Sequence, residues 1–367
     1  MKIAMIGHKR IPSRQGGVEV VVEQLAIRMA AQGHCVEVYN RKERVLKNNE
    51  LLRAYKGVRI IEIPTFRSST LNAFVYSVLA TLRALFGKYD VIHYHAEGPC
   101  GMLWLPHLLG IRTVATIHGL DWQRSKWGGF ASKYLRYGEK IAAKYANQVI
   151  VLSHNIKQYF LDTYQRDVVY IPNGIEIPEH KESQLIIQQF GLEKDGYILF
   201  LARIVPEKGL HYLLEAYGGL STDKKLVIAG DLKEGGEYIN RILAMGKQDD
   251  RVIFVGHASG QLLAELFSNC FLYVLPSDVE GMALSLLEAL SYQAVCLVSD
   301  IAENTEIVGT HMPVFQHSDV QSLRDMLQTL LQDGIESYRN ALFYDQLFKE
   351  YDWHEIVQQT LRLYQRS

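Results

Sequence analysis

The sequence predicts an α/β protein with two parallel-sheet lobes. Short apolar runs rich in β-branched residues alternate with helical patterns along the 367 residues, which is typical of a parallel sheet with helices on both faces. The alternation pauses at YIPNGIEIPEH (170–180), a plausible linker with an Asn-Gly turn. Ligands bind such sheets beyond the carboxyl ends of the strands, so we expect a cleft between the lobes with functional residues directly after strands.

The expected elements follow in order along the chain. The first lobe (1–175) is expected to contain strands at 2–6, 35–39, 58–63, 90–95, 112–118 and 148–153, with a helix at 18–33. A short helix near 184–190 precedes the second lobe (190–345), whose expected strands are 197–202, 225–230, 251–256, 271–276 and 294–300. The amphipathic end of the chain is predicted to be helical, and its last part (346–367) is expected to pack back on the first lobe.

Composition indicates an ordinary soluble protein in a reducing cytoplasm. The net charge of −1 argues against a dedicated nucleic-acid binder. The four cysteines show no CxxC spacing, and three lie in apolar surroundings that favour reduced, buried thiols. No signal peptide is recognisable at the start of the sequence. The apolar stretch 71–87 contains Arg83 and is shorter than about 20 residues, so we expect a packed helix there.

The stretch PSDVEGMALSLLEAL (276–290) follows an expected strand and starts a helix. Backbone N–H groups at a helix start favour an anion, and Gly281 would let a ligand approach the backbone. Glu288 would lie about 7–8 Å along the helix, a distance that matches the span from a diphosphate to a ribose or sugar. A carboxylate there can accept two hydrogen bonds from a vicinal diol. A salt bridge from Glu288 to a neighbouring strand explains the pattern equally well.

A second loop of the same lobe, FLARIVPEKGL (200–210), places two cations after a strand. Arg203 offers a planar fork and Lys208 a point charge, and together they suit a diphosphate leaving group. The alternative is two solvated surface cations.

The first lobe offers a Gly16–Gly17 loop between its first strand and helix, and the stretch TIHGLDWQR (116–124) after another strand. The loop could form a nest of backbone amides, but it is not GxGxxG, so the dinucleotide fingerprint is missing. His118 could bind a sugar hydroxyl, although a histidine satisfied within the core is an equal alternative. Asp121 follows His118 closely. The sequence contains no DxD, HExxH, cysteine cluster, GxSxG or P-loop motif, so we expect cations and helix dipoles to neutralise phosphate without a metal or other cofactor.

Together these motifs resemble the retaining family 4 glycosyltransferases with the GT-B fold, in which two Rossmann-like lobes face a central cleft. EGMALSLLE (280–288) is similar to the E-x7-E signature of that family, and RIVPEK (203–208) to its R-x4-K phosphate loop. The resemblance extends in the right order over most of the chain through the early GG loop, YIPNGI (170–175), VIAGD (227–231) and RVIFVG (251–256). The first lobe looks like a subgroup described as rhamnosyl- or galactosyltransferases of bacterial polysaccharide synthesis.

The resemblance implies a role for each matching residue. Glu288 would bind the nucleotide ribose, and Arg203 and Lys208 would stabilise the departing diphosphate. Glu280 would hold the transferred sugar and the phosphates together with the backbone amides of Gly281, Met282, Ala283 and Leu284.

Further contacts are implied in both lobes. The Gly16–Gly17 loop would contact the phosphates, and His118 would contact the sugar. Val255 and Gly256 would lie near the base. Met282 and Ala283 stand where the family usually has phenylalanine and glycine, which puts the shape of the sugar pocket in doubt more than the nucleotide site.

The implied reaction moves a hexosyl or deoxyhexosyl group from a nucleotide-diphosphate sugar to a saccharide acceptor, with retention of configuration. We expect a front-side displacement in which the leaving diphosphate takes the acceptor proton and the protein supplies positioning and charge stabilisation. Glu280 is a candidate covalent nucleophile by residue type alone. The alternatives are a sugar-nucleotide 2-epimerase of the same fold and a non-catalytic two-lobed sugar-binding protein.

A basic, aromatic stretch (124–148) indicates a possible membrane contact. Four cations share one predicted helix face: Lys133, Arg136, Lys140 and Lys144. Such helices bind anionic membrane surfaces, although an ordinary solvated face is an equal alternative. The resemblance adds weight to the membrane interpretation, because acceptors of this family are often lipid-linked saccharides. We therefore expect a cytoplasmic protein that works at the inner face of the membrane.

Overall fold

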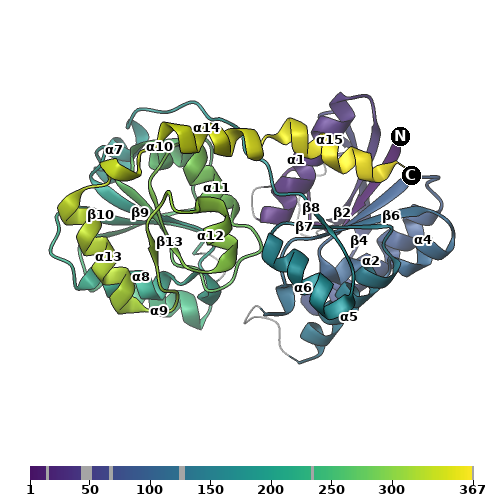
Figure 1. Cartoon of the computed structure of the whole chain (residues 1–367), viewed down its shortest axis with the longest axis horizontal. Coiled ribbons are helices and arrows are strands. Elements are labelled where there is room, and N and C mark those ends of the chain that lie inside the picture. Colours follow the sequence, from purple (N-terminus) through teal and green to yellow (C-terminus); the bar gives the residue numbers. More distant parts are fainter. Residues whose placement is uncertain (14–15, 43–51, 66–68, 124–128, 233–234, 366–367) are drawn as a thin grey trace. The chain divides into compact units, whose positions relative to one another are not determined.

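The computed structural model describes residues 1–13, 16–42, 52–65, 69–123, 129–232 and 235–365. The chain forms two compact units, Met1–Gly174 with Tyr351–Ser367, and Ile175–Glu350. Each unit has its own parallel sheet with helices on both faces (Figure 1). The predicted pair of α/β lobes is therefore confirmed.

The first unit has an eight-stranded sheet with the order β3-β4-β2-β1-β5-β6-β7-β8. Its strands are β1 (Lys2–Ile6), β2 (Cys35–Lys42), β3 (Ala54–Tyr55), β4 (Val58–Pro64), β5 (Val91–His95), β6 (Arg112–Ile117), β7 (Gln148–Val151) and β8 (Val169–Tyr170). All neighbours are parallel except β3 and β4. The central strand β1 is a continuous apolar run with nothing exposed over residues 3–6, as a strand covered on both faces requires.

Helices connect these strands. They are α1 (Gly17–Ala31), α2 (Ser69–Leu85), α3 (Glu97–Cys100), α4 (Trp104–Leu108), η1 (Asp121–Gln123), α5 (Gly129–Tyr145), α6 (His154–Tyr164) and α15 (Trp353–Tyr364). The start of α6 shows how the sequence sets a boundary. The Ser153 hydroxyl accepts a hydrogen bond from the Ile156 N–H (3.2 Å), which satisfies one of the free donors of the first helical turn.

The second unit has a six-stranded parallel sheet with the order β11-β10-β9-β12-β13-β14. Its strands are β9 (Tyr197–Leu201), β10 (Lys225–Ala229), β11 (Val252–Gly256), β12 (Leu272–Leu275), β13 (Cys296–Ser299) and β14 (Val314–Phe315). Its helices are α7 (Leu185–Phe190), η2 (Pro206–Lys208), α8 (Leu210–Gly218), α9 (Glu237–Gly246), α10 (Gly260–Asn269), α11 (Leu284–Ser291), α12 (Ala302–Val308), α13 (Val320–Asp333), η3 (Glu336–Tyr338) and α14 (Ala341–Glu350).

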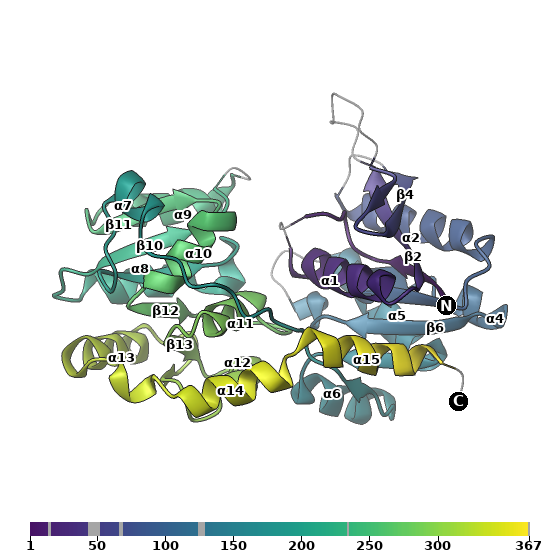
Figure 2. The ribbon, with the colours of Figure 1, turned by 90° about the horizontal axis from the view of Figure 1, so that it is seen from above.

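The C-terminal helix α15 belongs to the first unit and lies beside α1 (Figures 1 and 2). Its first residue, Trp353, is buried so closely against Gly174 that a Cβ at Gly174 would lie 2.4 Å from the indole ring. The Arg28 guanidinium of α1 stacks 5.3 Å from the centre of the same ring. The Arg112 side chain of β6 donates to the Leu363 carbonyl (2.9 Å). Aromatic and polar contacts thus fix the whole helix on this sheet.

All the strands that the sequence predicts are present, and three further strands (β3, β8 and β14) are each two residues long. Two residues are too few to show an alternating pattern, which explains why the sequence did not reveal them. The apolar stretch 71–87 forms α2, as expected. Among the described residues, no helix has the length and apolar character that crossing a membrane requires. All four cysteines are free, and Cys100, Cys270 and Cys296 are buried.

Candidate functional site

Two loops of the second unit meet beyond the carboxyl ends of β9 and β12. The Lys208 ammonium, at the end of η2, forms an ion pair with the Glu280 carboxylate from the loop after β12. Only 11% of the lysine side chain and 6% of the glutamate side chain are exposed. The backbones also meet, because the Asp278 N–H donates to the Glu207 carbonyl (2.9 Å). Two predicted site residues that lie 72 positions apart are therefore in direct contact.

Glu280 is held by a small network of buried side chains. Its Oε1 atom also accepts a hydrogen bond from the Ser277 hydroxyl (2.7 Å). The Ser299 hydroxyl, at the end of β13, donates to the Ser277 carbonyl (2.5 Å), and the Asn304 amide donates to the Ser299 hydroxyl (3.1 Å). Buried polar groups need such partners, and together they restrict the position of the carboxylate.

Gly209 allows the two loops to approach each other. Its φ of +67° lies in the left-handed region, and a Cβ at this position would lie 1.8 Å from the Pro276 carbonyl oxygen. No other residue type fits this space without displacing the backbone. The Lys208–Glu280 contact therefore depends on this glycine.

The helix that carries Glu288 begins later than the sequence indicated. α11 starts at Leu284 with Ala283 as its N-cap, so the amides of Gly281 and Met282 belong to the preceding loop. The Ala283 carbonyl accepts hydrogen bonds from the N–H groups three and four residues further on, those of Leu286 (3.0 Å) and Leu287 (3.1 Å). Glu288 lies in the second turn, as predicted, and is half-buried.

Tyr273 on β12 lies close to both predicted carboxylates. Its hydroxyl is within hydrogen-bond distance of the Leu201 carbonyl (3.2 Å) and the Ser285 hydroxyl (3.0 Å). Burial raises the pKa of Tyr273 well above its usual range, and the negative charges of Glu280 and Glu288 add to the shift. This neutral phenol joins the end of β9 to the first turn of α11.

The remaining predicted residues of the second unit lie after neighbouring strands. Arg203 is on the same loop as Lys208, but its side chain is exposed and forms no hydrogen bond or ion pair with the other described residues. Val255 and Gly256 end β11. The Gly256 carbonyl accepts a hydrogen bond from the Gly230 N–H (2.9 Å), which joins the ends of β10 and β11.

In the first unit, the predicted Gly16–Gly17 loop is accompanied by acidic side chains. Gly16 is the N-cap of α1 and has an extended backbone. The Glu19 carboxylate, in the first turn, accepts a hydrogen bond from the Lys9 N–H (2.9 Å), and a Cβ at Gly16 would lie 2.2 Å from its Oε2 atom. The Glu23 carboxylate accepts from the Ser13 N–H (3.4 Å). The start of this helix therefore already has negative charge.

His118 lies directly after β6 and is partly exposed. Its Nε2 atom lies 3.1 Å from the Nδ1 atom of His95, the last residue of β5. His95 and its neighbour on the strand, His93, are fully buried. Burial lowers the pKa of His93 to about 3 and that of His95 well below its usual range. The sequence predicted a role for His118 but not for the two buried histidines behind it.

Three carboxyl groups of the first unit lie close to one another, because Asp121 and Glu139 both act on Glu97. Glu97 of α3 and Glu139 of α5 are buried, and Asp121 begins η1. Glu139 accepts hydrogen bonds from the Trp122 indole (3.0 Å) and from the hydroxyls of Tyr159 (2.8 Å) and Tyr164 (2.6 Å). Burial, followed by the charges of Asp121 and Glu139, raises the pKa of Glu97 well above its usual range. Burial and two neighbouring carboxyl groups therefore favour the protonated form of Glu97, whereas Glu139 has three hydrogen-bond donors.

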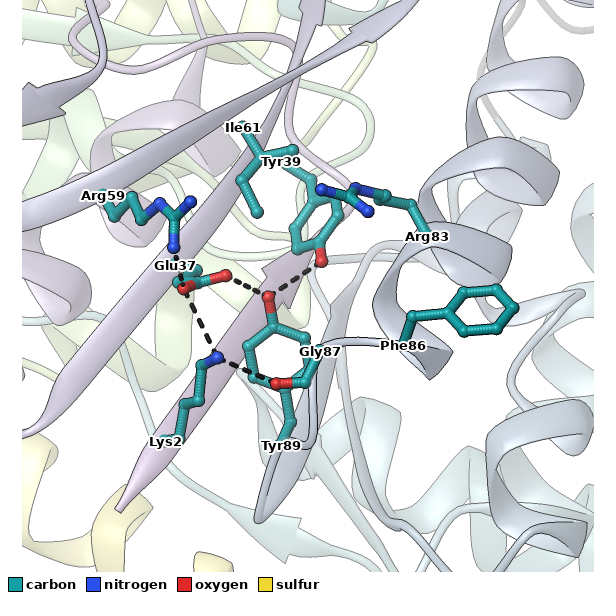
Figure 3. Close-up of a pocket in the computed structure, with 9 residues that line it drawn as sticks. All are labelled: Lys2, Glu37, Tyr39, Arg59, Ile61, Arg83, Phe86, Gly87 and Tyr89. Atoms are coloured by element: carbon teal, nitrogen blue, oxygen red, sulfur yellow. Dashed lines mark hydrogen bonds and ion pairs between the residues drawn. The ribbon is translucent and has the colours of Figure 1, made fainter.

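A cavity of about 180 Å³ lies at the other, amino-terminal end of the first sheet (Figure 3). Its buried acid, Glu37, accepts hydrogen bonds from Arg59 (3.0 Å) and the Tyr89 hydroxyl, and lies 3.6 Å from the Lys2 ammonium. Figure 3 shows these groups around Glu37, while Phe86 points away from them. Because Glu37 already has three partners, we interpret this cluster as a support for the strands.

The basic face predicted on α5 is present. Lys133, Arg136, Lys140 and Lys144 are all exposed, and none has an ion-pair partner in the described part of the chain. Phe130 and Tyr137 on the same helix are 79% and 47% exposed. Tyr134 differs, because its hydroxyl donates to the Gly98 carbonyl (2.8 Å). Residues 124–128, at the start of the predicted basic stretch, lie outside the described residues.

Several supporting residues carried no recognised motif. Ser277 lies two residues after β12 and Ser299 ends β13, and each precedes an aspartate, in PSD (276–278) and VSD (298–300). This repeated Ser-Asp pair is the signal that could have identified them. Among the described residues, no group of three or more histidine, cysteine, aspartate or glutamate side chains is arranged to hold a metal ion.

Comparisons with known proteins agree with this architecture. Residues 15–178 match the family model "Glycosyltransferase Family 4", and residues 182–343 match "Glycosyl transferases group 1". A UDP-Gal:alpha-D-GlcNAc-diphosphoundecaprenol alpha-1,3-galactosyltransferase of Escherichia coli is 28% identical over 306 residues, which cover 76% of each chain.

Two solved structures share the fold over almost the whole chain. Sucrose-phosphate synthase from Thermosynechococcus elongatus superposes with a TM-score of 0.84 at 20% identity, covering 99% of this chain and 98% of the other. Anabaena HepE in complex with UDP and glucose superposes with a TM-score of 0.80 at 18% identity, with the same coverage.

Proposed function

Because this chain belongs to the GT-B glycosyltransferases that combine a family 4 lobe with a group 1 lobe, we propose that it transfers a hexosyl or deoxyhexosyl group from a nucleoside-diphosphate sugar to a saccharide acceptor, with retention of configuration. The observation that carries this proposal is the buried Lys208–Glu280 pair at the carboxyl ends of β9 and β12, close to the start of α11. Ligands of parallel sheets bind at these strand ends.

The diphosphate is proposed to bind to the second unit. Lys208 supplies a buried positive charge, and Arg203 offers an exposed guanidinium on the same loop. Phosphate oxygens form strong charge-assisted hydrogen bonds with both groups. The amides of residues 281–284 and the positive end of α11 add further donors. Glu288, one turn along the helix, is proposed to accept hydrogen bonds from the ribose, with Val255 and Gly256 near the base.

Glu280 is proposed to position Lys208 and the transferred sugar. Its Oε1 atom is already occupied by Lys208 and Ser277, and these contacts lower the nucleophilicity of the carboxylate. A front-side displacement is therefore favoured over a covalent intermediate. The leaving diphosphate takes the acceptor proton, and Lys208 stabilises the charge that develops on it. No step of this mechanism requires a metal ion.

UDP-linked sugars are the donors to test first. Anabaena HepE, which shares the fold, was crystallised with UDP and glucose. The first unit contributes Gly16, Gly17 and His118 to the proposal, with the glycines near the phosphates and His118 near the sugar.

The acceptor is proposed to be a lipid-linked saccharide in glycan synthesis. The E. coli relative acts on a saccharide carried on diphosphoundecaprenol, as its name states. The four exposed cations of α5 and the exposed Phe130 suit an anionic lipid surface at the inner face of the membrane. No nucleic acid is involved in this proposal.

A thermal-shift panel of nucleoside diphosphates and their sugars tests the proposal, because a ligand that binds only the folded protein raises its melting temperature. We expect one nucleoside diphosphate and one of its sugars to stabilise the protein, and the sugar to be consumed only when an acceptor is present. Conversion of the donor without an acceptor would indicate the epimerase instead. Binding of a free saccharide and of no nucleotide would indicate the non-catalytic sugar-binding protein.

A further inference from the structure

A row of four aromatic side chains runs from the C-terminal helix to His118. The Tyr364 hydroxyl, at the end of α15, lies 2.6 Å from Nδ1 of His93. The His93 and His95 rings lie 4.1 Å apart between centroids, and Nδ1 of His95 lies 3.1 Å from Nε2 of His118. Tyr364, His93 and His95 are all buried, so the row lies inside the first unit and only His118 is partly exposed.

His93 is held from both sides by hydroxyl groups. Besides Tyr364 at Nδ1, the Thr116 hydroxyl lies 2.7 Å from its Nε2. A neutral imidazole has one donor and one acceptor nitrogen, and hydroxyls can serve either. Burial disfavours a charged imidazole, which agrees with the lowered pKa of His93. The ring is therefore a neutral, fixed surface against which His95 packs.

The surroundings of His95 determine where the protons lie. Its Nε2 atom is buried and has no hydrogen-bond partner among the described residues. A proton on this nitrogen would be a buried donor without an acceptor, which native structures avoid more strictly than an unused acceptor. The proton of His95 therefore belongs on Nδ1, where it is donated to Nε2 of His118. His118 then carries its own proton on Nδ1.

We propose that Tyr364, His93 and His95 are positioning residues that hold His118 as a neutral hydrogen-bond donor with its proton on Nδ1. Because Nε2 of His118 is occupied by His95, His118 is not free to act as a base through that nitrogen. The ligand that receives its hydrogen bond, a sugar hydroxyl, rests on the function proposed above. The protonation state itself does not depend on that function.

Nitrogen NMR of the full-length protein with labelled histidine tests the proposal without any ligand. The His118 signals, identified by their loss in His118→Gln, are expected to show a protonated Nδ1 and an unprotonated Nε2. His95→Phe keeps an aromatic ring but removes the donor, so His118 should move towards the Nε2-protonated tautomer. His95→Asn places an amide donor near the position of Nδ1 and should restore the wild-type pattern.

Tyr364→Phe tests the far end of the row. It leaves Nδ1 of His93 without its hydroxyl, so we expect a smaller shift of the His118 signals in the same direction. Tyr217→Phe is the matched control, because it removes one buried hydroxyl hydrogen bond (2.6 Å to the Lys224 carbonyl) in the other unit. Thermal unfolding of each variant shows whether it is folded. Unchanged His118 signals in folded Tyr364→Phe would remove Tyr364 and His93 from the proposal.

An Nε2-protonated His118 in the wild-type protein would overturn the whole proposal.

A kinetic comparison separates the positioning role of His95 from the proposed glycosyltransferase function. With the sugar donor that the thermal-shift panel selects, His95→Phe should lower kcat/KM roughly tenfold, and His95→Asn should recover most of it. A predicted NMR pattern with no turnover of any donor would contradict the proposed function alone. An equal kcat/KM in the wild-type protein, His95→Phe and His95→Asn would contradict only the positioning role.

Discussion

The two units present opposite chemistry at the carboxyl ends of their sheets. The second unit places charges there, with the buried Lys208–Glu280 pair, the exposed Arg203 and the half-buried Glu288. The first unit places neutral histidines there, and the start of its first helix already carries Glu19. A diphosphate is highly charged, whereas a sugar is not. The difference agrees with the proposal that the diphosphate binds mainly to the second unit and that His118 of the first unit contacts the sugar.

The energetics of burial support this division. A buried ion pair is seldom more stable than an apolar pair of similar size, because both charges lose their hydration. The second unit nevertheless keeps one, along with a network of Ser277, Ser299 and Asn304 around it. The proposed role of Lys208 at the diphosphate would account for this cost. In the first unit, burial instead holds the histidines neutral.

The largest effect is expected from breaking the ion pair of the second unit. Lys208→Ala would leave Glu280 buried without its counter-charge, so the free energy of unfolding should fall by about 3–5 kcal/mol. Turnover should fall more than donor affinity, because Lys208 acts mainly on the departing diphosphate. Urea denaturation and steady-state kinetics measure the two effects.

Two further variants control for this interpretation. Lys247→Ala removes an exposed lysine from the same unit and should change the unfolding free energy by less than about 0.5 kcal/mol. Lys208→Met with Glu280→Gln removes both charges and should be more stable than Lys208→Ala alone. Equal losses of turnover and of donor affinity in Lys208→Ala would show that Lys208 contributes only ground-state binding.

Acid should weaken the first unit before the second. Burial lowers the pKa of His8 to about 4 and that of His93 to about 3, so the unfolded chain binds protons below pH 6.5 that the folded chain does not. Stability is therefore complete above pH 6.5 and is lost as the pH falls, by about 2 kcal/mol for each of these histidines at pH 5. His95 acts in the same direction, and the raised pKa of Glu97 partly opposes it.

Hydrogen exchange of the full chain at pH 7 and pH 5, corrected for intrinsic exchange rates, measures this effect. Protection of β1, β5 and β6 should fall more than protection of β9, β10 and β12. In the second unit, the carboxylates Asp249, Glu265 and Asp300 have lowered pKa values and remain ionised at pH 5. Equal losses of protection in the two sheets would contradict the contrast between neutral histidines in the first unit and charged groups in the second.

A smaller effect is expected from Glu288→Ala. The residue is half-buried on α11, so its loss should change the unfolding free energy by less than about 1 kcal/mol. Nucleoside-diphosphate affinity should fall roughly tenfold, because two hydrogen bonds to the ribose are lost. Titration calorimetry measures the affinity. An unchanged affinity would show that Glu288 does not bind the nucleotide.

The smallest effect on the isolated protein is expected from neutralising the basic face of α5. Replacing Lys133, Arg136, Lys140 and Lys144 with glutamine should lower the free energy of unfolding by no more than about 1 kcal/mol, because Arg136 stacks on Trp122 (4.0 Å to the ring centre). It should reduce flotation with anionic vesicles, because each cation near the surface adds about 1 kcal/mol. A control with the same change of charge replaces four exposed lysines of the second unit, namely Lys181, Lys194, Lys247 and Lys349. Equal flotation of both variants would indicate an ordinary solvated face.

The sequence predicted most of the fold because continuous apolar runs such as β1 and β9 have one stable environment, the middle of a parallel sheet. It also placed Lys208 and Glu280 on the loops after β9 and β12, where the structure has them, and their role in binding the donor stays a prediction. It did not predict their direct contact, which depends on the close approach of two loops at Gly209. The start of α11 was placed too early, since no side chain caps it and the loop before it leaves no signal.

The buried partners of His118 could not be found from the sequence. His93 and His95 lie on an apolar strand, where a histidine is most often a buried core residue whose ring nitrogens have hydrogen-bond partners. Tyr364 lies 271 positions after His93, and no local pattern shows that the two meet. Such contacts arise only from tertiary packing, in this case the docking of α15 on the first unit.

A crystal structure with the nucleoside diphosphate that the thermal-shift panel selects tests the central claim most directly. We predict that its phosphates lie within hydrogen-bond distance of Arg203, Lys208 and the amides of residues 281–284, with the ribose on Glu288. Phosphates bound only at the Gly16–Gly17 loop of the first unit, with Lys208 still paired solely to Glu280, would contradict the division of roles between the two units.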